Sequence, residues 1–157
     1  MALFDVKKYE TPSPENVDME RTKYNVGVFL SAYLSARTRV GQPREPKITS
    51  SFSLVPPSFS NQTSAQAEDI LIQNEDAKEE FYYLNDLFER GFSTVQHPFK
   101  PEISNRRKQV FYDRYILGKS IYVVAQSNHI SEETVKQDSI AALVQFCEAL
   151  GILVLKE

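Results

Sequence analysis

The last third of the chain carries the signals that most constrain its fold, because four residues there can begin or end helices. Gly118 suits the left-handed position that follows a helix end, and Ser120 is a good N-cap for a short helix after it. Asn128 is the expected left-handed stop of that short helix. Ser131 can then cap a longer amphipathic helix. A short helix, a tight turn and a longer helix are typical of a helix-turn-helix motif.

A further helix is expected to precede this pair. Ser104 can cap it, and apolar residues such as Val110 and Phe111 mark its inward side to about Leu117. Residues 99–157 are therefore predicted to form one helical unit with an apolar C-terminal tail. If this unit binds DNA, its last helix would enter the major groove by its N-terminal turns, and the earlier helices would contact the backbone.

The outward side chains of that N-terminus are of types that read base edges. The residues predicted to read bases are Glu133, Thr134, Lys136 and Gln137. Positive and hydroxyl side chains on the preceding segments suit phosphate contacts. The residues predicted to contact the DNA backbone are Arg106, Arg107, Lys108, Lys119, Ser120 and Ser131.

The distribution of charge along the chain fits a DNA-binding unit better than the net charge does. The chain of 157 residues has a net charge of −3, which alone disfavours a nucleic-acid partner. The acid is concentrated in residues 62–98, whereas residues 99–119 hold six basic and two acidic side chains. The local basic block is the relevant electrostatic footprint for DNA, although the acidic pair Glu132 and Glu133 at the start of the last helix argues against phosphate contact there.

The rest of the chain also predicts helices, so we expect an all-α fold. Residues 1–17 contain two prolines and are expected to form an extended lead-in. Residues 18–98 are expected to form a helical N-terminal part. Its first helix is capped by Asp18 and ends near Val40. Apolar faces are expected from Tyr24, Val28, Ala32 and Leu34, widened by Phe29, Leu30 and Tyr33.

A strap rich in proline and serine is expected over residues 42–62, with its aromatic side chains docked on the helices. Thr63 and Gln66 resemble a capping box for the next helix, which is expected to run to Arg90 with Gly91 beyond its end. Its apolar residues recur at helical spacing, and the opposite face is acidic. That face is expected to be solvated; repulsion of DNA or binding of a basic partner is the alternative.

No residue pattern points to catalysis, so the chain is not expected to be an enzyme or to need a cofactor or a metal. His97 and His129 lack carboxylate or cysteine neighbours at ligand spacing, and the single Cys147 is expected to be a small core residue. The first eight residues mix acid and base without a long apolar stretch, which favours a cytoplasmic protein over a secreted one. The apolar tail 152–155 either packs back on the helical unit or pairs with a second copy in a homodimer.

Residues 107–143 resemble the region of sigma factors that reads the −35 promoter element, through Tyr115, the step from Gly118 to Ser120, and Thr134 to Lys136. Over residues 20–155 the chain resembles the ArpU family of phage and prophage transcriptional regulators of Gram-positive bacteria. The matching segments are Phe29 to Tyr33 with Arg37 and Arg39, Pro46 to Thr49, Ser58 to Asn61, and Leu150 to Val154. The resemblance implies control of late phage genes for packaging and lysis.

Two other functions remain open on the sequence. One is a non-catalytic phage packaging or assembly protein of the small-terminase type, in which the motif serves oligomerisation. The other is a sigma-like adaptor that mainly binds RNA polymerase.

Overall fold

The computed structural model describes residues 2–42, 46 and 65–157, with side chains described from residue 75 onward in the long third helix. In the described residues, five α-helices follow a short N-terminal one. In chain order the helices are α1 (Val6–Tyr9), α2 (Met19–Arg39), α3 (Ala65–Ser93), α4 (Pro101–Phe111), α5 (Ile121–Asn128) and α6 (Glu132–Ala149). A 3₁₀ turn, η1 (Pro14–Asn16), precedes α2, and a π-helical turn, η2 (Tyr112–Ile116), continues α4. The all-α fold is thus confirmed, and the described residues contain no β-strand.

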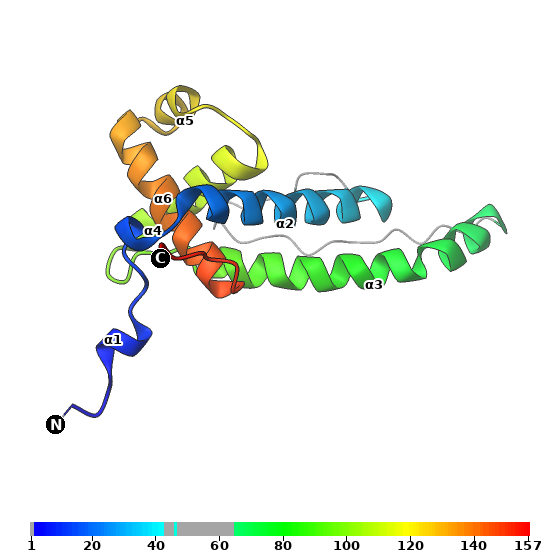
Figure 1. Ribbon diagram of the computed structural model, residues 1–157. Helices are drawn as coiled ribbons and strands as arrows, with labels where there is room; N and C mark the ends of the chain where they lie inside the picture. The colour runs from blue at the N-terminus through cyan, green and yellow to red at the C-terminus, as the bar shows by residue number, and fades with distance from the viewer. Residues whose placement is uncertain (1, 43–45, 47–64) are drawn as a thin grey trace.

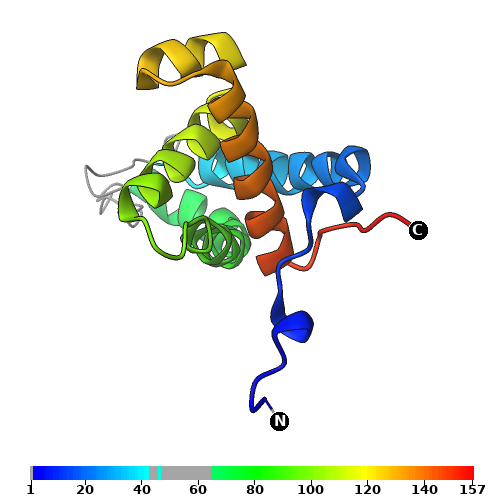
Figure 2. The same cartoon turned by 90° about the vertical axis from the view of Figure 1, so that its left-hand side faces the viewer.

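The long helices α2 and α3 pack against each other as a hairpin that extends to one side of the molecule (Figure 1). The helices α4, α5 and α6 form a second group at the other side, and α6 runs back toward the end of α3. Figure 2 shows α5 and the first turn of α6 standing clear of the rest of the chain. No helix of the described residues is long and apolar enough to cross a membrane.

An aromatic core joins the two groups. The ring of Tyr33 from α2 stacks on that of Phe88 from α3 with centroids 4.5 Å apart, and Phe111 from α4 lies 4.9 Å from Phe146 of α6. Phe88 in turn meets Phe146 edge-on at 5.8 Å. The core is therefore continuous from the hairpin into α4 and α6, and aromatic pairs of this geometry add to the stabilisation from burial alone.

The first core helix begins and ends as its sequence predicts. The side chain of Asp18 accepts a hydrogen bond from the amide of Arg21, and Gly41 has a φ of 78° just beyond the helix. Its inward face matches the prediction in part: Leu30, Tyr33 and Leu34 are buried, whereas Tyr24, Val28 and Ala32 are exposed. The other buried residues of α2 are Thr22, Val26, Ala36 and Arg37.

The third helix continues past its predicted end. Gly91 lies inside α3, which ends at Ser93, so the interpretation of Gly91 as a helix stop is wrong. A Cβ atom at this position would lie 2.6 Å from the ring of Phe146. The glycine is needed because α3 and α6 approach closely there. The expected capping box at Thr63 and the strap over residues 42–62 lie almost wholly outside the described residues; Pro46 accepts a hydrogen bond from the hydroxyl of Tyr112 at 2.6 Å.

The C-terminal tail packs on the start of α2. Val17 and Leu155 form an isolated antiparallel bridge, and the amide of Asp18 donates to the carbonyl of Val154 at 2.8 Å. The hydroxyl of Thr22 accepts from the amide of Val154 at 3.1 Å. The tail thus pairs within its own chain with the start of α2, and Ile152 and Leu153 also pack on the core cluster to which α6 contributes. The lead-in, expected to be extended, contains α1 and η1 between extended residues.

Candidate nucleic-acid interface

The pair of helices α5 and α6 is joined by a three-residue turn that local signals specify. Ser120 accepts a hydrogen bond from the amide of Val123 at 3.3 Å, and Ser131 accepts from that of Thr134 at 3.1 Å, so both predicted caps are confirmed. Each cap satisfies one of the amides that a helix start leaves without a partner.

The left-handed residue of the turn is His129 and not Asn128, which corrects the prediction. His129 has a φ of 56°, whereas Asn128 is the last residue of α5. The amide group of the Asn128 side chain donates to the carbonyl of Val124 at 2.9 Å and to Asp113 at 3.4 Å. These bonds hold Asn128 in the helix, and the left-handed position moves to the next residue.

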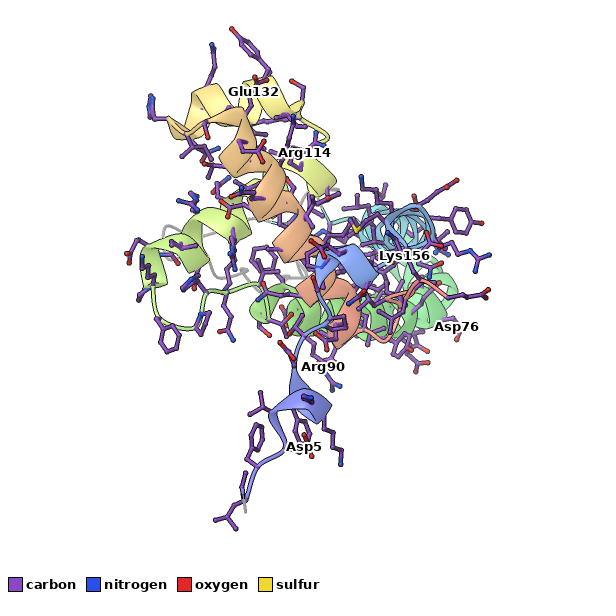
Figure 3. The ribbon with its side chains drawn as sticks, turned by 60° about the vertical axis from the view of Figure 1, so that its left-hand side comes forward. Asp5, Asp76, Arg90, Arg114, Glu132 and Lys156 are labelled. Carbon is purple, nitrogen blue, oxygen red and sulfur yellow. The ribbon has the colours of Figure 1, made fainter. Side chains whose placement is uncertain are left out.

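The buried side of this pair forms a small apolar cluster of its own. Val124 and Ala125 of α5 pack with Val135 of α6 and with Val110 of α4. The three helices are thereby fixed relative to one another, and α6 presents its N-terminal turns outward. In Figure 3, Glu132 labels this outer end of α6.

The residues predicted to read bases lie on that outer end. Glu133, Lys136 and Gln137 are exposed, and Gln137 donates to Glu133 at 3.5 Å along the helix. Thr134 is half-buried, and its hydroxyl lies 2.8 Å from that of Ser131. Thr134 therefore helps to form the cap, and the freely presented side chains are the other three.

Two arginines of the predicted basic block form ion pairs within the chain. The first helix of this unit begins at Pro101, so Ser104 is not its N-cap; the Ser104 hydroxyl instead accepts from the amide of His97 at 2.7 Å. Arg106 and Arg107 both bind the carboxylate of Asp138, which is 2% exposed.

Asp138 therefore clamps α6 to α4. Arg106 reaches the carboxylate through Nε at 2.6 Å and Nη2 at 3.3 Å. Arg107 reaches it through Nε at 3.3 Å and donates from Nη1 to the carbonyl of Gln96. The hydrogen bond to Asp138 raises the pKa of Arg106 above its ordinary value. Sequence reasoning missed Asp138, although its position three residues after Val135 and four before Ala142 places it on the inward stripe of α6.

The other residues predicted to contact the DNA backbone lie in two parts of the structure. Lys108 lies with its ammonium 5.8 Å from the centre of the Phe92 ring, on the side of the core. Lys119 lies beside Ser120 at the start of α5, with its ammonium 3.9 Å from the carboxylate of the buried Asp113. The structure thus brings Lys119, Ser120 and Ser131 to the exposed helix pair, and places Lys108 away from it.

Two exposed side chains of α5 were not foreseen. Gln126 donates to the hydroxyl of Tyr122 at 2.7 Å, and both face outward. The signal was present, because the buried positions Val124 and Ala125 leave Tyr122 and Gln126, one turn apart, on the outer side of the helix. Cys147, in contrast, is buried as expected, and burial raises the pKa of its thiol to about 12.

The structure is thus an all-α protein in which the serine-capped N-termini of α5 and α6 are exposed at one end of the molecule. Over 156 residues the chain is 32% identical to the uncharacterized phage-related protein Lin1259/Lin1739 of Listeria innocua. The alignment covers 99% of each chain. It is also 21% identical over 147 residues to protein Gp66 of Listeria phage A118, with 94% of this chain and 96% of that protein covered. The chain belongs to this family of phage-related proteins. No family model and no solved structure matches it.

Proposed function

We propose that this phage-related protein is a sequence-specific DNA-binding regulator of transcription. The observation that carries the proposal is the exposed N-terminal half of α6, which two serine caps, an apolar cluster and the Asp138 clamp hold in one orientation. A helix presented in this way after a short helix and a tight turn suits the major groove.

In this proposal Lys136 and Gln137 read bases, with Glu133 beside them. Lysine suits the acceptors of guanine, glutamine suits adenine, and a carboxylate accepts from cytosine; each good contact contributes about 1–3 kcal/mol of discrimination. Thr134 contributes through the cap that positions the helix. The two glutamates at the start of α6 also interact favourably with the helix dipole, which gives them a role without DNA.

The phosphate contacts are assigned to groups near the same surface. Lys119 and Ser120 lie at the start of α5, and Arg106 keeps its Nη1 edge for a phosphate while Nε and Nη2 hold Asp138. The acidic face of α3 does not oppose this approach, because Asp76 lies far from Glu132 in Figure 3. The acidic residues are thus separated from the proposed DNA surface.

The finer assignment rests on the resemblance to the ArpU family and to the −35-reading unit of sigma factors. Together with membership of a phage-related family, it supports control of late phage genes for packaging and lysis, in the cytoplasm of the bacterial host. Direct contact with RNA polymerase is part of the adaptor alternative.

The proposal is tested by binding of the purified chain to fragments of the phage genome, followed by footprinting. We expect a specific shift, and we expect Lys136→Ala and Gln137→Ala to relax which sequence is preferred by about 1–3 kcal/mol per lost contact. Lys119→Ala is expected to weaken binding to all sequences and to lower the salt slope by about one. Arg90→Ala is the control that should change neither, because Arg90 lies far from Glu132 in Figure 3. A wild-type chain that binds no DNA at any salt concentration would overturn the proposal.

The packaging alternative is favoured by one observation, the long α2–α3 hairpin, which takes no part in the proposed DNA surface. It predicts ring-like oligomers and binding that is indifferent to sequence. The adaptor alternative predicts co-purification with RNA polymerase without a DNA shift.

A further inference from the structure

The outer face of α2 is uncharged and covered by nothing in the described part of the chain. The stretch from Tyr24 to Ala36 contains no charged residue. Tyr24 is 73% and Val28 55% exposed, and a Cβ atom added at Gly27 would meet no atom within 4 Å. An exposed helix face is normally polar or charged, so this one has the composition of a helix–helix contact.

The same face has small residues in a helical row. Gly27, Ser31 and Ser35 recur every four residues beside the row of Tyr24 and Val28, and all five are exposed. Small side chains let a second helix approach closely, and the adjacent tyrosine and valine supply apolar area.

Two of the charges at the ends of this face are paired within the chain, and the exposed Glu20 and Lys23 that precede it are opposite in sign. Arg21 lies 3.7 Å from Asp18, and Arg39 lies 3.2 Å from Glu80 of α3. A face without net charge does not repel an identical face, which is the first requirement for a two-fold contact between copies.

The N-terminal arm, residues 2–10, has exposed apolar side chains and packs on no other part of the chain that the structure describes. None of the residues of α1 is buried, and Leu3, Phe4, Val6 and Tyr9 are all exposed. Figure 1 and Figure 2 show the arm projecting away from the helices. A helix of four residues is not stable by itself, so α1 needs a surface to pack on.

The root of the arm determines which surface it can reach. Hydrogen bonds from Asp18 to Val154 and from Lys156 to Asn16 fix the chain at the start of α2. Four exposed acidic residues of α3 lie near the opposite end of α2, where Glu80 pairs with Arg39; they are Glu75, Asp76, Glu79 and Glu80. Its own α2 spans about 30 Å, so Lys7 and Lys8 would reach these carboxylates only in a fully extended arm.

We propose that two copies of this chain form a two-fold dimer in which the outer faces of α2 pack antiparallel and the arms are exchanged. Antiparallel packing places the arm root of each copy beside the Arg39 end of the other. The basic pair Lys7 and Lys8 then meets the acidic end of the partner's α3, so the contact is complementary in charge as well as apolar. The arms also add the area that one helix face lacks against the roughly 800 Å² per partner of a stable interface.

The proposal is tested by sedimentation equilibrium of the full chain over a range of concentrations, with circular dichroism as the check of folding. The wild-type chain is expected to dimerise, and Val28→Glu is expected to weaken the dimer about 100-fold or more, because it buries a charge without a partner. Val123→Glu is the matched control, since Val123 is an exposed valine on α5 and its substitution should leave the dimer unchanged.

A charge exchange identifies the arm's binding site. Lys7→Glu with Lys8→Glu is expected to weaken the dimer about 3- to 10-fold, and so is Asp76→Lys with Glu79→Lys. All four substitutions together should restore the wild-type affinity. A wild-type chain that remains monomeric, or a dimer that Val28→Glu leaves intact, overturns the proposal; a dimer without rescue by the charge exchange overturns the arm's placement.

Discussion

The α5–turn–α6 pair and the α2–α3 hairpin are both pairs of adjacent helices, but different forces hold them. The first is short, and its caps and turn are made by residues within five positions of one another, while Val110 and the Asp138 clamp hold it on α4. The second is long and is fixed by aromatic rings that come from distant parts of the chain. Rules based on neighbouring residues in the sequence therefore predict the structure of the first region well and that of the second poorly.

The largest effect is expected at the connection between the two regions, the Asp138 clamp. Asp138→Ala leaves two guanidinium groups without their carboxylate and is expected to destabilise the fold by about 3 kcal/mol, limited by the access of both arginines to water. Asp86→Ala is the matched control, since Asp86 pairs with Arg90 on the surface, and it should cost less than about 1 kcal/mol. Denaturant unfolding measures both; equal losses would contradict the buried clamp.

The hairpin is tested where α3 meets α6. Gly91→Ala places a methyl group against the ring of Phe146 and is expected to destabilise the fold by about 1–3 kcal/mol, although alanine is the better helix former. Adding Phe146→Leu should recover part of this loss, because the smaller side chain makes room. If Gly91→Ala were stabilising, the glycine would be an ordinary helix position and the close approach would be refuted.

The helix pair is tested at its caps, where a smaller effect is expected. Ser120→Ala and Ser131→Ala should each destabilise by about 1 kcal/mol, because each removes the acceptor of one amide at a helix start. Ser127→Ala, at an exposed position inside α5, should change the free energy of unfolding by no more than about 0.5 kcal/mol. Equal effects of all three would argue against the caps as the source of the turn's stability.

The smallest effect is expected from substitutions that test whether His129 or Asn128 is the left-handed residue of the turn. His129→Gly should stabilise the fold by up to about 1 kcal/mol, because glycine adopts the left-handed conformation without strain. Asn128→Gly should destabilise it, because Asn128 is helical and its side chain bonds Val124 and Asp113. Thermal unfolding distinguishes these opposite signs, and the reverse order would restore Asn128 as the left-handed residue.

The sequence predicted what depends on neighbours in the chain. The all-α class, the caps Asp18, Ser120 and Ser131, and the left-handed Gly118 follow from a few adjacent residues and were confirmed. The inward face of α2 was predicted only in part: Leu34 is buried as expected, but Tyr24 and Val28 are exposed although they are as apolar as the buried residues. Only the position of α3 decides which side of such a helix is inside.

The candidate site shows the same division. The exposure of Lys136 and Gln137 follows from helical periodicity, so their placement was predictable. The engagement of Arg106 and Arg107 was not, because it depends on a carboxylate about 30 positions away. A basic block in a sequence does not reveal how much of its charge is already paired inside the fold.

The pairing of the tail with the start of α2 has a consequence for synthesis. The hydrogen bond between Thr22 and Val154 joins positions 132 apart. On the ribosome, the first turn of α2 therefore waits on the order of 10 s for the residues that cover it. The α2–α3 hairpin is complete long before that, so we expect the nascent chain to pass through a stage in which the hairpin is formed while Val17 is still exposed to chaperones.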